Sequence, residues 1–387
     1  MNTHHFDSIS QDDLRNQGSF KWTQHPNMIG AFIAEMDFGT APAVRDAITE
    51  AVGRNAFGYV PDALSDDLRE ACCRWQHDRY NWNVTPDQVH PVADVLTILE
   101  LTVKHFTPAD SAVIVLTPTY MPFLTLPGRW GRQVIEVPLI ENHAGWDIDD
   151  LAVDDALSTG AGLVILCNPG NPTGHVLRAD QLTRLSSLVA SHNAFVFADE
   201  IHAPLIYPGT THVPYASLSA TTRSHTITAT SAAKGWNIPG LKCAQAIIQD
   251  SAIAAEWTKQ CGRAEDGAST LGIIANIAAY RDGEGWLNEI VSYLDHNRQV
   301  LGDELAARIP AIRYTQPQAT YLSWLDCREL ELGDTPWEFF RDRAGVLTTN
   351  GVACGARGAG HLRLNFATPR PILVAAIAAM ADALDER

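Results

Sequence analysis

The sequence predicts an α/β fold in which a mostly parallel sheet lies between helices and is joined to a smaller α+β domain. Through the middle of the chain, short and continuous apolar runs alternate with amphipathic stretches, a pattern typical of strands buried on both faces. A chain of 387 residues also exceeds the size at which one hydrophobic core stops growing, so two domains are expected.

The predicted elements follow one another in a regular order. A polar N-terminal arm leads to a helix over 41–54. The apolar runs come next, and those predicted to be strands are SAVIVLT (111–117), QVIEVPL (133–139), GLVILC (162–167), AFVFAD (194–199), TITATS (226–231) and CAQAIIQ (243–249). An amphipathic helix is predicted over 178–193, between two of these strands.

The pattern changes from about residue 285. A long helix over 285–309 is followed by two predicted strands, YLSWLDC (321–327) and HLRLNFA (361–367), and by a last helix that begins near 371. This pattern is typical of a small α+β domain. We therefore predict three parts, namely an N-terminal arm with part of the small domain (1–50), a large domain (51–284) and a C-terminal small domain (285–387).

The composition argues against several classes of function. The chain has 28 lysines and arginines against 45 acidic residues, a net charge of −17, so it would be repelled by phosphate backbones and anionic lipids. We expect no nucleic-acid or membrane partner, and an anionic ligand must be held by local basic groups. Seven scattered cysteines without a Cys-x-x-Cys pair indicate reduced thiols in a cytoplasmic protein, and no metal-ligand spacing occurs.

Ligands of parallel sheets bind beyond the carboxyl ends of the strands, so the residues that follow each predicted strand are the candidates for chemistry. Asp199 ends AFVFAD and could pair with a protonated heterocyclic nitrogen, or simply cap a helix or bind magnesium. Lys234 follows TITATS without a neighbouring carboxylate and could form a Schiff base, although a lone lysine is more often a surface residue. Ser231 could donate its hydroxyl to a phosphate.

Three further residues lie in comparable positions. Asn171 is in the turn-rich loop CNPGNPTG, which could aim its amide at a ring hydroxyl. Tyr120 follows SAVIVLT and could stack on a flat ring. Arg363 interrupts an apolar strand and could clamp a carboxylate with two parallel hydrogen bonds. Each residue also has an ordinary structural explanation. Asn171 could simply belong to a loop, Tyr120 could pack in the core, and Arg363 could pair with a structural acid.

Taken together, the order of these residues resembles a known family. Asn171-Pro-Thr-Gly, Asp199, Ser231-x-x-Lys234 and Arg363 follow one another as in the class I/II aminotransferase superfamily of fold-type-I pyridoxal-phosphate (PLP) enzymes, and the resemblance runs from Phe6 to the C-terminus. Finer motifs are similar to those of its carbon–sulfur β-lyase branch, the cystathionine β-lyases. They are FDSISQDDLRNQGSFKW (6–22), AEMDF (34–38), FGY (57–59), DEIH (199–202), KGWNIPGLK (234–242), ATYLSWLD (319–326) and GHLRLNFATPR (360–370).

The resemblance implies the fold-type-I architecture, PLP as cofactor and a role for each residue at the coenzyme ring. Lys234 would join the coenzyme aldehyde covalently, and Asp199 would keep the pyridine nitrogen protonated. Tyr120 would stack on the ring. Asn171 would bond the ring hydroxyl, with His202 nearby in the place where aspartate aminotransferases carry a tyrosine. Lys234, Asp199 and Tyr120 are thus the predicted catalytic residues.

It also implies a phosphate site and a substrate site. Ser231 and the backbone of Val95 and Leu96 would bind the phosphate, and Tyr59 would reach the phosphate of a neighbouring subunit, so that a homodimer shares its active sites. Arg363, with Asn171, would hold the substrate α-carboxylate.

Three positions differ from what either the branch or the aminotransferases usually carry. Glu35 stands where the branch has aspartate, and Asp94 replaces a small residue of the phosphate-binding turn. Lys242 lies where aminotransferases often have a phosphate-binding arginine. Glu35 is therefore given no role, and the phosphate contacts at residues 95 and 96 are expected to come from the backbone alone.

The reaction implied by the branch is a β-elimination that converts an L-cysteine thioether such as cystathionine into a thiol, pyruvate and ammonia, a step of methionine biosynthesis. An aminotransferase on the same scaffold is the main alternative, because a fold does not fix the reaction type. A non-catalytic regulatory protein that contacts a transcription factor is a second one. The loops that select the substrate are expected near Phe38, Tyr120, Trp236 and Tyr321.

Overall fold

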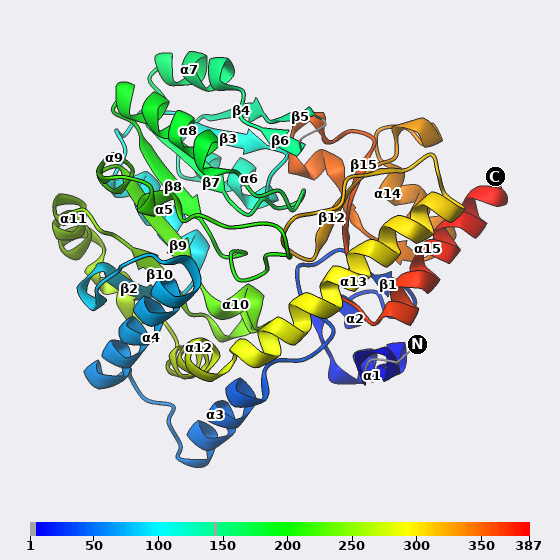
Figure 1. Ribbon diagram of the computed structural model, residues 1–387, viewed down its shortest axis with the longest axis horizontal. Coiled ribbons are helices and arrows are strands. Elements are labelled where there is room, and N and C mark those ends of the chain that lie inside the picture. The colour runs from blue at the N-terminus through cyan, green and yellow to red at the C-terminus, as the bar shows by residue number, and fades with distance from the viewer. Residues whose placement is uncertain (1–4, 143–144) are drawn as a thin grey trace.

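A seven-stranded sheet lies at the centre of the larger part of the molecule, as the computed structural model of residues 5–142 and 145–387 shows (Figure 1). In spatial order its strands are β2 (Val89–Val92), β10 (Ala244–Ile247), β9 (Thr226–Thr230), β8 (Phe195–Asp199), β7 (Leu163–Cys167), β3 (Val113–Thr117) and β4 (Val134–Pro138). The strands from β9 to β4 are parallel, whereas β10 is antiparallel to both of its neighbours. The predicted α/β class is confirmed, and all the predicted strands of the large domain are present. The sequence did not predict β2, because VHPV is short and contains a proline.

Helices cover both faces of this sheet, which explains why its strands are continuously apolar. Val113 and Val115 of β3 pack on one face with α5 (Val95–His105), α6 (Met121–Arg129) and α11 (Ser251–Cys261). Ile114 and Leu116 point to the other face, against α7 (Asp150–Ser158) and α8 (Ala179–Ser191). Successive side chains of a strand alternate between faces, so a strand between two helical layers must be apolar at every position.

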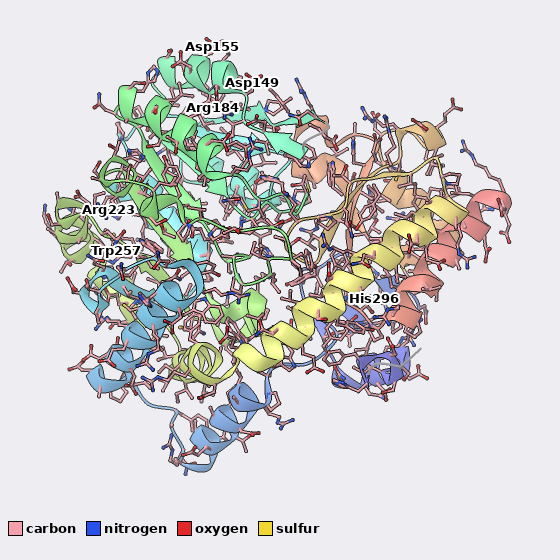
Figure 2. The ribbon with its side chains drawn as sticks, in the orientation of Figure 1. Asp149, Asp155, Arg184, Arg223, Trp257 and His296 are labelled. Carbon is pink, nitrogen blue, oxygen red and sulfur yellow. The ribbon has the colours of Figure 1, made fainter. Side chains whose placement is uncertain are left out.

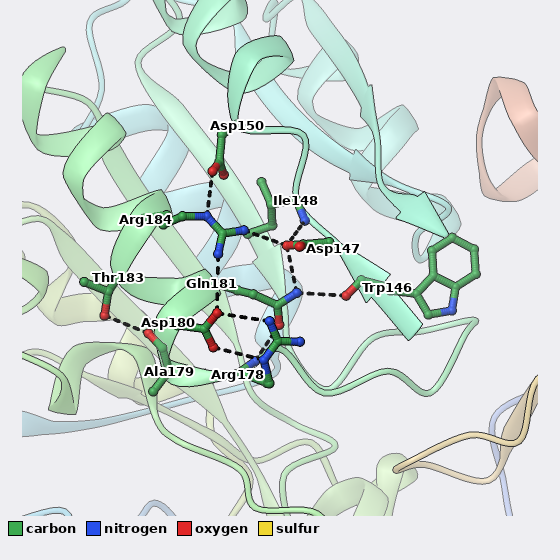
Figure 3. Close-up of polar contacts among 10 residues, drawn as sticks. All are labelled: Trp146, Asp147, Ile148, Asp150, Arg178, Ala179, Asp180, Gln181, Thr183 and Arg184. Carbon is green, nitrogen blue, oxygen red and sulfur yellow. Dashed lines mark hydrogen bonds and ion pairs between the residues drawn. The ribbon is translucent and has the colours of Figure 1, made fainter. Parts of the chain in front are cut away.

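Polar contacts tie α8 to the edge of the molecule formed by α7 and the hairpin of β5 (Ile140–Asn142) and β6 (Gly145–Asp147) (Figure 3). The Arg184 guanidinium donates to Asp150 at 2.6 Å and to Asp147 at 2.7 Å. Gln181 Nε2 donates to Asp147 Oδ1 at 2.8 Å. The apolar side chains of α8 pack in the core, and the network lies beside them with Gln181 buried and Arg184 partly exposed, as is compatible with the amphipathic helix predicted there.

A smaller, four-stranded antiparallel sheet lies beside the first. Its order is β11 (Arg313–Tyr314), β12 (Leu322–Asp326), β15 (His361–Asn365) and β14 (Thr349–Asn350). The long helix α13 (Glu284–Arg308), yellow in Figure 1, runs diagonally across the molecule beside α15 (Arg370–Asp385). The remaining helices are α1 (Gln11–Gln17), α2 (Phe20–Thr23), α3 (Pro42–Gly53), α4 (Asp62–Tyr80), α9 (Ala220–Arg223), α10 (Ala232–Gly235), α12 (Thr270–Asp282) and α14 (Pro336–Phe339). The two sheets are consistent with two domains, and the boundaries at 50 and 284 stay a prediction.

A buried ion pair joins two parts of the N-terminal arm to each other. Lys21 Nζ lies 2.9 Å from Asp37 Oδ2, and both side chains are almost inaccessible to water. Trp22 Nε1 donates to the other carboxylate oxygen at 2.8 Å. Strand β1 (Ile29–Gly30) pairs with β13 (Val346–Leu347). The arm therefore enters the protein interior and carries residues 31–37, here called the 31–37 segment, past the small sheet.

The surface carries the excess of acidic residues, and Figure 2 shows exposed charged side chains such as Asp155 and Arg223 at the periphery. All seven cysteines are free thiols, and five of them are buried. Within residues 5–142 and 145–387, no helix is long and apolar enough to cross a lipid bilayer.

Candidate active site

A cavity of about 680 Å³ lies where the carboxyl ends of the parallel strands face the 31–37 segment and the small sheet. All the predicted site residues line it except Tyr59. They are Val95, Leu96, Tyr120, Asn171, Asp199, His202, Ser231, Lys234 and Arg363. Parallel pairing explains this convergence, because β3, β7, β8 and β9 all end at the same edge of the sheet.

Lys234 lies in the short helix α10, directly after β9, with its amine turned toward the 31–37 segment. Its Nζ donates to the carbonyl oxygen of Ala34 at 2.9 Å. The pKa of this amine is lowered to about 8, mainly by burial and also by Arg363, while Glu35 and Asp199 act against the shift. A buried amine with a lowered pKa is a competent nucleophile and base near neutral pH.

Asp199 ends β8, and its carboxyl group is buried. Its Oδ1 accepts a hydrogen bond from the Ile201 amide at 3.1 Å, and the Cys167 thiol lies 3.9 Å from Oδ2. Burial raises the pKa of Asp199 to about 7. A cation that binds close to the buried Asp199 carboxyl would stabilise its ionised form.

His202 lies one turn beyond Asp199 and is almost completely buried. Burial lowers the pKa of its imidazole to about 3, with Lys234 and Arg363 acting in the same direction, so the ring is neutral. Its Nδ1 has no hydrogen-bond partner among the described residues. The ring meets Tyr321 edge to face, with centroids 6.0 Å apart.

Arg363 enters the cavity from β15, in the middle of the small sheet. Its Nη1 donates to Asn171 Oδ1 at 3.1 Å, and its Nη2 donates to Thr349 Oγ1 at 3.0 Å and to the Phe32 carbonyl. Its Nε is buried and has no partner in the described part of the chain. These contacts fix the guanidinium plane next to the loop of Asn171, whose bond to Pro172 is cis.

The helix α5 begins at the cavity wall. Asp94 caps its N-terminus by accepting from the Thr97 amide at 2.9 Å, while helix geometry leaves the amides of Val95 and Leu96 without an acceptor in the helix. The second carboxylate oxygen of Asp94 lies 3.0 Å from Lys242 Nζ. The Lys242 ammonium thus neutralises the charge of Asp94, the residue that replaces a small one in this turn.

The remaining predicted residues are Tyr120 and Ser231, which line the cavity, and Tyr59, which does not. Tyr120 lines it, packed edge to face against Phe123 with centroids 5.4 Å apart. The Ser231 hydroxyl also lines it, but donates to the Cys243 carbonyl at 2.6 Å. Tyr59 lies between α3 and α4, is fully exposed to solvent and does not line the cavity of its own chain.

Comparison with known proteins identifies the family of the chain. The family model of aminotransferase class I and II matches residues 27–378. The chain belongs to this family. It is 36% identical to the cystathionine beta-lyase of Corynebacterium glutamicum, over 96% of this chain and 98% of that protein. It is 32% identical to the cystathionine beta-lyase PatB of Bacillus subtilis, over 90% and 92% of the two chains.

A solved structure has the same fold. The PLP-bound C-S lyase of Staphylococcus hominis superposes with a TM-score of 0.90 at 28% identity, covering 99% of this chain and all of that one. The fold of the family, inferred above from sequence motifs, is therefore confirmed across nearly the whole chain.

Sequence motifs did not identify every group of this site. The carbonyls of Phe32 and Ala34 hold the two buried cations, yet a backbone oxygen leaves no trace in the residue type. Thr349 was also missed, because a single threonine in a loop-rich region is not distinctive. Phe38, Trp236 and Tyr321 themselves lie in the hydrophobic core, whereas nearby residues such as Glu35 and Lys234 line the cavity. The expectation that the loops near them select the substrate stays a prediction.

Proposed function

We propose that the protein is a PLP-dependent carbon–sulfur β-lyase that cleaves L-cysteine thioethers, with cystathionine as the representative substrate, to a thiol, pyruvate and ammonia. One observation carries the proposal: an amine of lowered pKa, a buried carboxyl and a buried guanidinium face one cavity from three different elements. The relatives named as cystathionine β-lyases support it.

The residues of the cavity fit the coenzyme. Its volume suits a ligand of that size together with a substrate. Asp199 would face the pyridine nitrogen, whose positive charge favours the ionised carboxyl. Asn171 and the neutral His202, with its unpartnered Nδ1, would face the ring hydroxyl. The first turn of α5 would hold the phosphate through the Val95 and Leu96 amides, and Ser231 would join them once its hydroxyl turns from Cys243.

The protein groups then position and deprotonate the substrate. Bound PLP supplies an electron sink that acidifies the substrate Cα–H bond. Arg363 binds the α-carboxylate, and the contacts of Arg363 with Thr349 and Asn171 fix that carboxylate in one orientation. The Cα–H bond is held close to Lys234, whose amine takes the proton.

The sulfur then leaves with the electron pair of the Cβ–S bond, and a proton converts the thiolate to the thiol. Lys234, which holds the proton taken from Cα, is the group placed to return it. In sum, one water molecule is consumed, and the substrate amino group leaves as ammonia while the carbon skeleton leaves as pyruvate.

The active unit in this proposal is a homodimer. Tyr59 lies outside the cavity of its own chain and is fully exposed to solvent. Phe57, in the same loop, is also exposed. An exposed tyrosine beside a second large apolar side chain is the composition expected at a protein interface. In the dimer, Tyr59 would contact the phosphate held by the partner subunit.

An assay for the two products separates this reaction from transamination on the same scaffold. The protein is incubated with PLP and L-cystathionine, and thiol and pyruvate are measured beside keto-acid exchange with 2-oxoglutarate. We expect thiol and pyruvate in equal amounts. Keto-acid exchange without thiol release would contradict the proposal and favour the aminotransferase. A protein that gains no visible absorbance with PLP would point to the non-catalytic alternative.

Lys234→Ala tests the residue at the centre of the site. The variant should lose thiol release by at least about a thousandfold, since it lacks both the covalent anchor and the base. Lys259→Ala on the exposed face of α11 is the matched control and should keep full activity. Borohydride reduction followed by peptide mapping should place the coenzyme label at position 234. A label on another lysine would overturn the assignment.

A further inference from the structure

The cavity contains one carboxylate to which the proposed reaction gives no task. Among the cavity carboxylates, Asp94 is paired with Lys242, and Asp199 is assigned to the pyridine nitrogen. Glu35 also lines the cavity. Within the described residues, no lysine, arginine or histidine forms an ion pair with its carboxylate. A half-buried charge without a counter-ion suggests a ligand that brings one.

The backbone that carries Glu35 is held on both sides. Asn365 Nδ2 donates to the carbonyl oxygens of Ile33 at 2.6 Å and of Glu35 at 2.7 Å. Asn237 then clamps Met36, accepting from its amide and donating to its carbonyl, each at 2.9 Å. The buried ion pair of Lys21 and Asp37 holds the last residue of the 31–37 segment. The Glu35 side chain therefore starts from a fixed point of the cavity wall.

The Glu35 carboxylate lines the cavity and affects the pKa of two neighbouring groups. Glu35 acts on the Lys234 amine, where it opposes the fall in pKa caused by burial. It also acts on Tyr321, where it adds to the rise in pKa that burial causes. Lys234 is thus a cation close to the Glu35 carboxylate, but Lys234 is the residue that would hold the coenzyme. The Glu35 carboxylate lines the cavity and has no ion-pair partner of its own among the described residues.

Arg363 and the coenzyme take up both charged groups of a cysteine unit, so the cation must lie elsewhere in the substrate. We propose that Glu35 binds a second ammonium group, carried on the sulfur substituent of the substrate. The preferred substrates are therefore S-substituted L-cysteines whose substituent ends in an amine, as in cystathionine or cystine, rather than S-alkyl or S-aryl cysteines. This inference rests on the lyase function proposed above and names the substrate class of that same site.

Three substrates and one variant test it with the PLP-loaded enzyme. L-Cystathionine carries a distal amine and a distal carboxylate, S-(3-aminopropyl)-L-cysteine keeps only the amine, and S-(3-carboxypropyl)-L-cysteine keeps only the carboxylate. In the unaltered protein, we expect kcat/KM for thiol release to be roughly tenfold to a hundredfold higher for the two amines, as a charge-assisted hydrogen bond allows.

Glu35→Gln keeps the shape of the side chain and removes its charge. This variant should lower kcat/KM for the two amines by roughly tenfold to a hundredfold and leave the carboxypropyl substrate unchanged, so that the preference disappears. Glu256→Gln, on the exposed face of α11, is the matched control and should leave the preference as it is. The visible absorbance of the bound coenzyme and the unfolding midpoint of each variant establish that the site is intact.

The possible outcomes are distinct. Equal losses for all three substrates would assign Glu35 to the reaction itself or to packing, and would overturn the inference. No loss for any substrate would overturn it too. In both cases thiol release by the unaltered protein leaves the lyase proposal standing. Absence of thiol from all three substrates in the unaltered protein would instead overturn the lyase proposal.

Discussion

The cavity has two walls that are built on different principles. On the wall formed by the central sheet, the polar groups are side chains such as Asp199 and Asn171. Each of them is placed by the end of a parallel strand. On the opposite wall, the 31–37 segment contributes mainly backbone oxygens, to which Lys234 and Arg363 donate. The first wall is held by ladder hydrogen bonds, and the second depends on a few buried polar side chains. Changes in these side chains should therefore have the larger structural effect.

The largest expected effect comes from Asp37→Asn. Removing one partner of a buried ion pair leaves Lys21 charged and uncompensated, which costs about 3–5 kcal/mol of the free energy of unfolding. The urea midpoint should fall accordingly, and thiol release should fall with it because the Ala34 and Phe32 carbonyls lose their fixed position.

The matched control for Asp37→Asn is Glu304→Gln in the exposed pair with Arg308, which should leave the urea midpoint unchanged. An Asp37→Asn protein with an unaltered midpoint would show that the ion pair does not hold the 31–37 segment.

A second, smaller effect is expected where the two walls meet. Arg363→Lys keeps the positive charge but cannot bond Asn171, Thr349 and Phe32 together in one plane. We expect kcat/KM for cystathionine to fall about a hundredfold, mostly through KM, as is usual when a bidentate carboxylate contact is lost. Steady-state kinetics check this. An unchanged KM would mean that the α-carboxylate is bound elsewhere.

The smallest effect is expected on the sheet wall, at the pair of Asp94 and Lys242. Lys242 is well exposed, so the pair contributes about 0.5 kcal/mol or less to stability after screening by solvent. Lys242→Gln should leave the urea midpoint unchanged, yet should weaken PLP retention several-fold because the Asp94 charge next to the phosphate is no longer neutralised. Dialysis followed by absorbance measurement tests this, and PLP retention equal to that of the parent protein would contradict it.

The two walls also differ in how well they could be predicted from sequence. Runs such as AFVFAD identify a buried strand, and the rule that ligands bind at strand ends then selects Asp199, Asn171 and Lys234. Their convergence on one cavity is confirmed, whereas their roles toward the coenzyme stay predictions. Short strands such as β2 escape prediction because four residues show no clear periodicity.

The other wall could not be predicted from residue types. Whether Ala34 or Phe32 presents its carbonyl to a cation depends on the path of the backbone. That path is set by Asn365 and Asn237 from distant parts of the chain and by the ion pair of Asp37 with Lys21. Trp236 shows how quickly side-chain direction changes along the chain, since this residue, two positions from Lys234, turns into the core and donates to the Gly283 carbonyl at 2.9 Å. Proximity in sequence does not imply proximity to a ligand in a helix as short as α10.

One backbone oxygen at the cavity is shared by two donors. The Ala34 carbonyl accepts from the Lys234 amine and also from the Tyr321 hydroxyl, each at 2.9 Å. A carbonyl has two lone pairs, so when the lysine changes partner during turnover, the tyrosine keeps this oxygen satisfied. The lysine is thereby free to swing between successive partners while the surrounding chain stays still, and no desolvated acceptor is left behind to slow its departure.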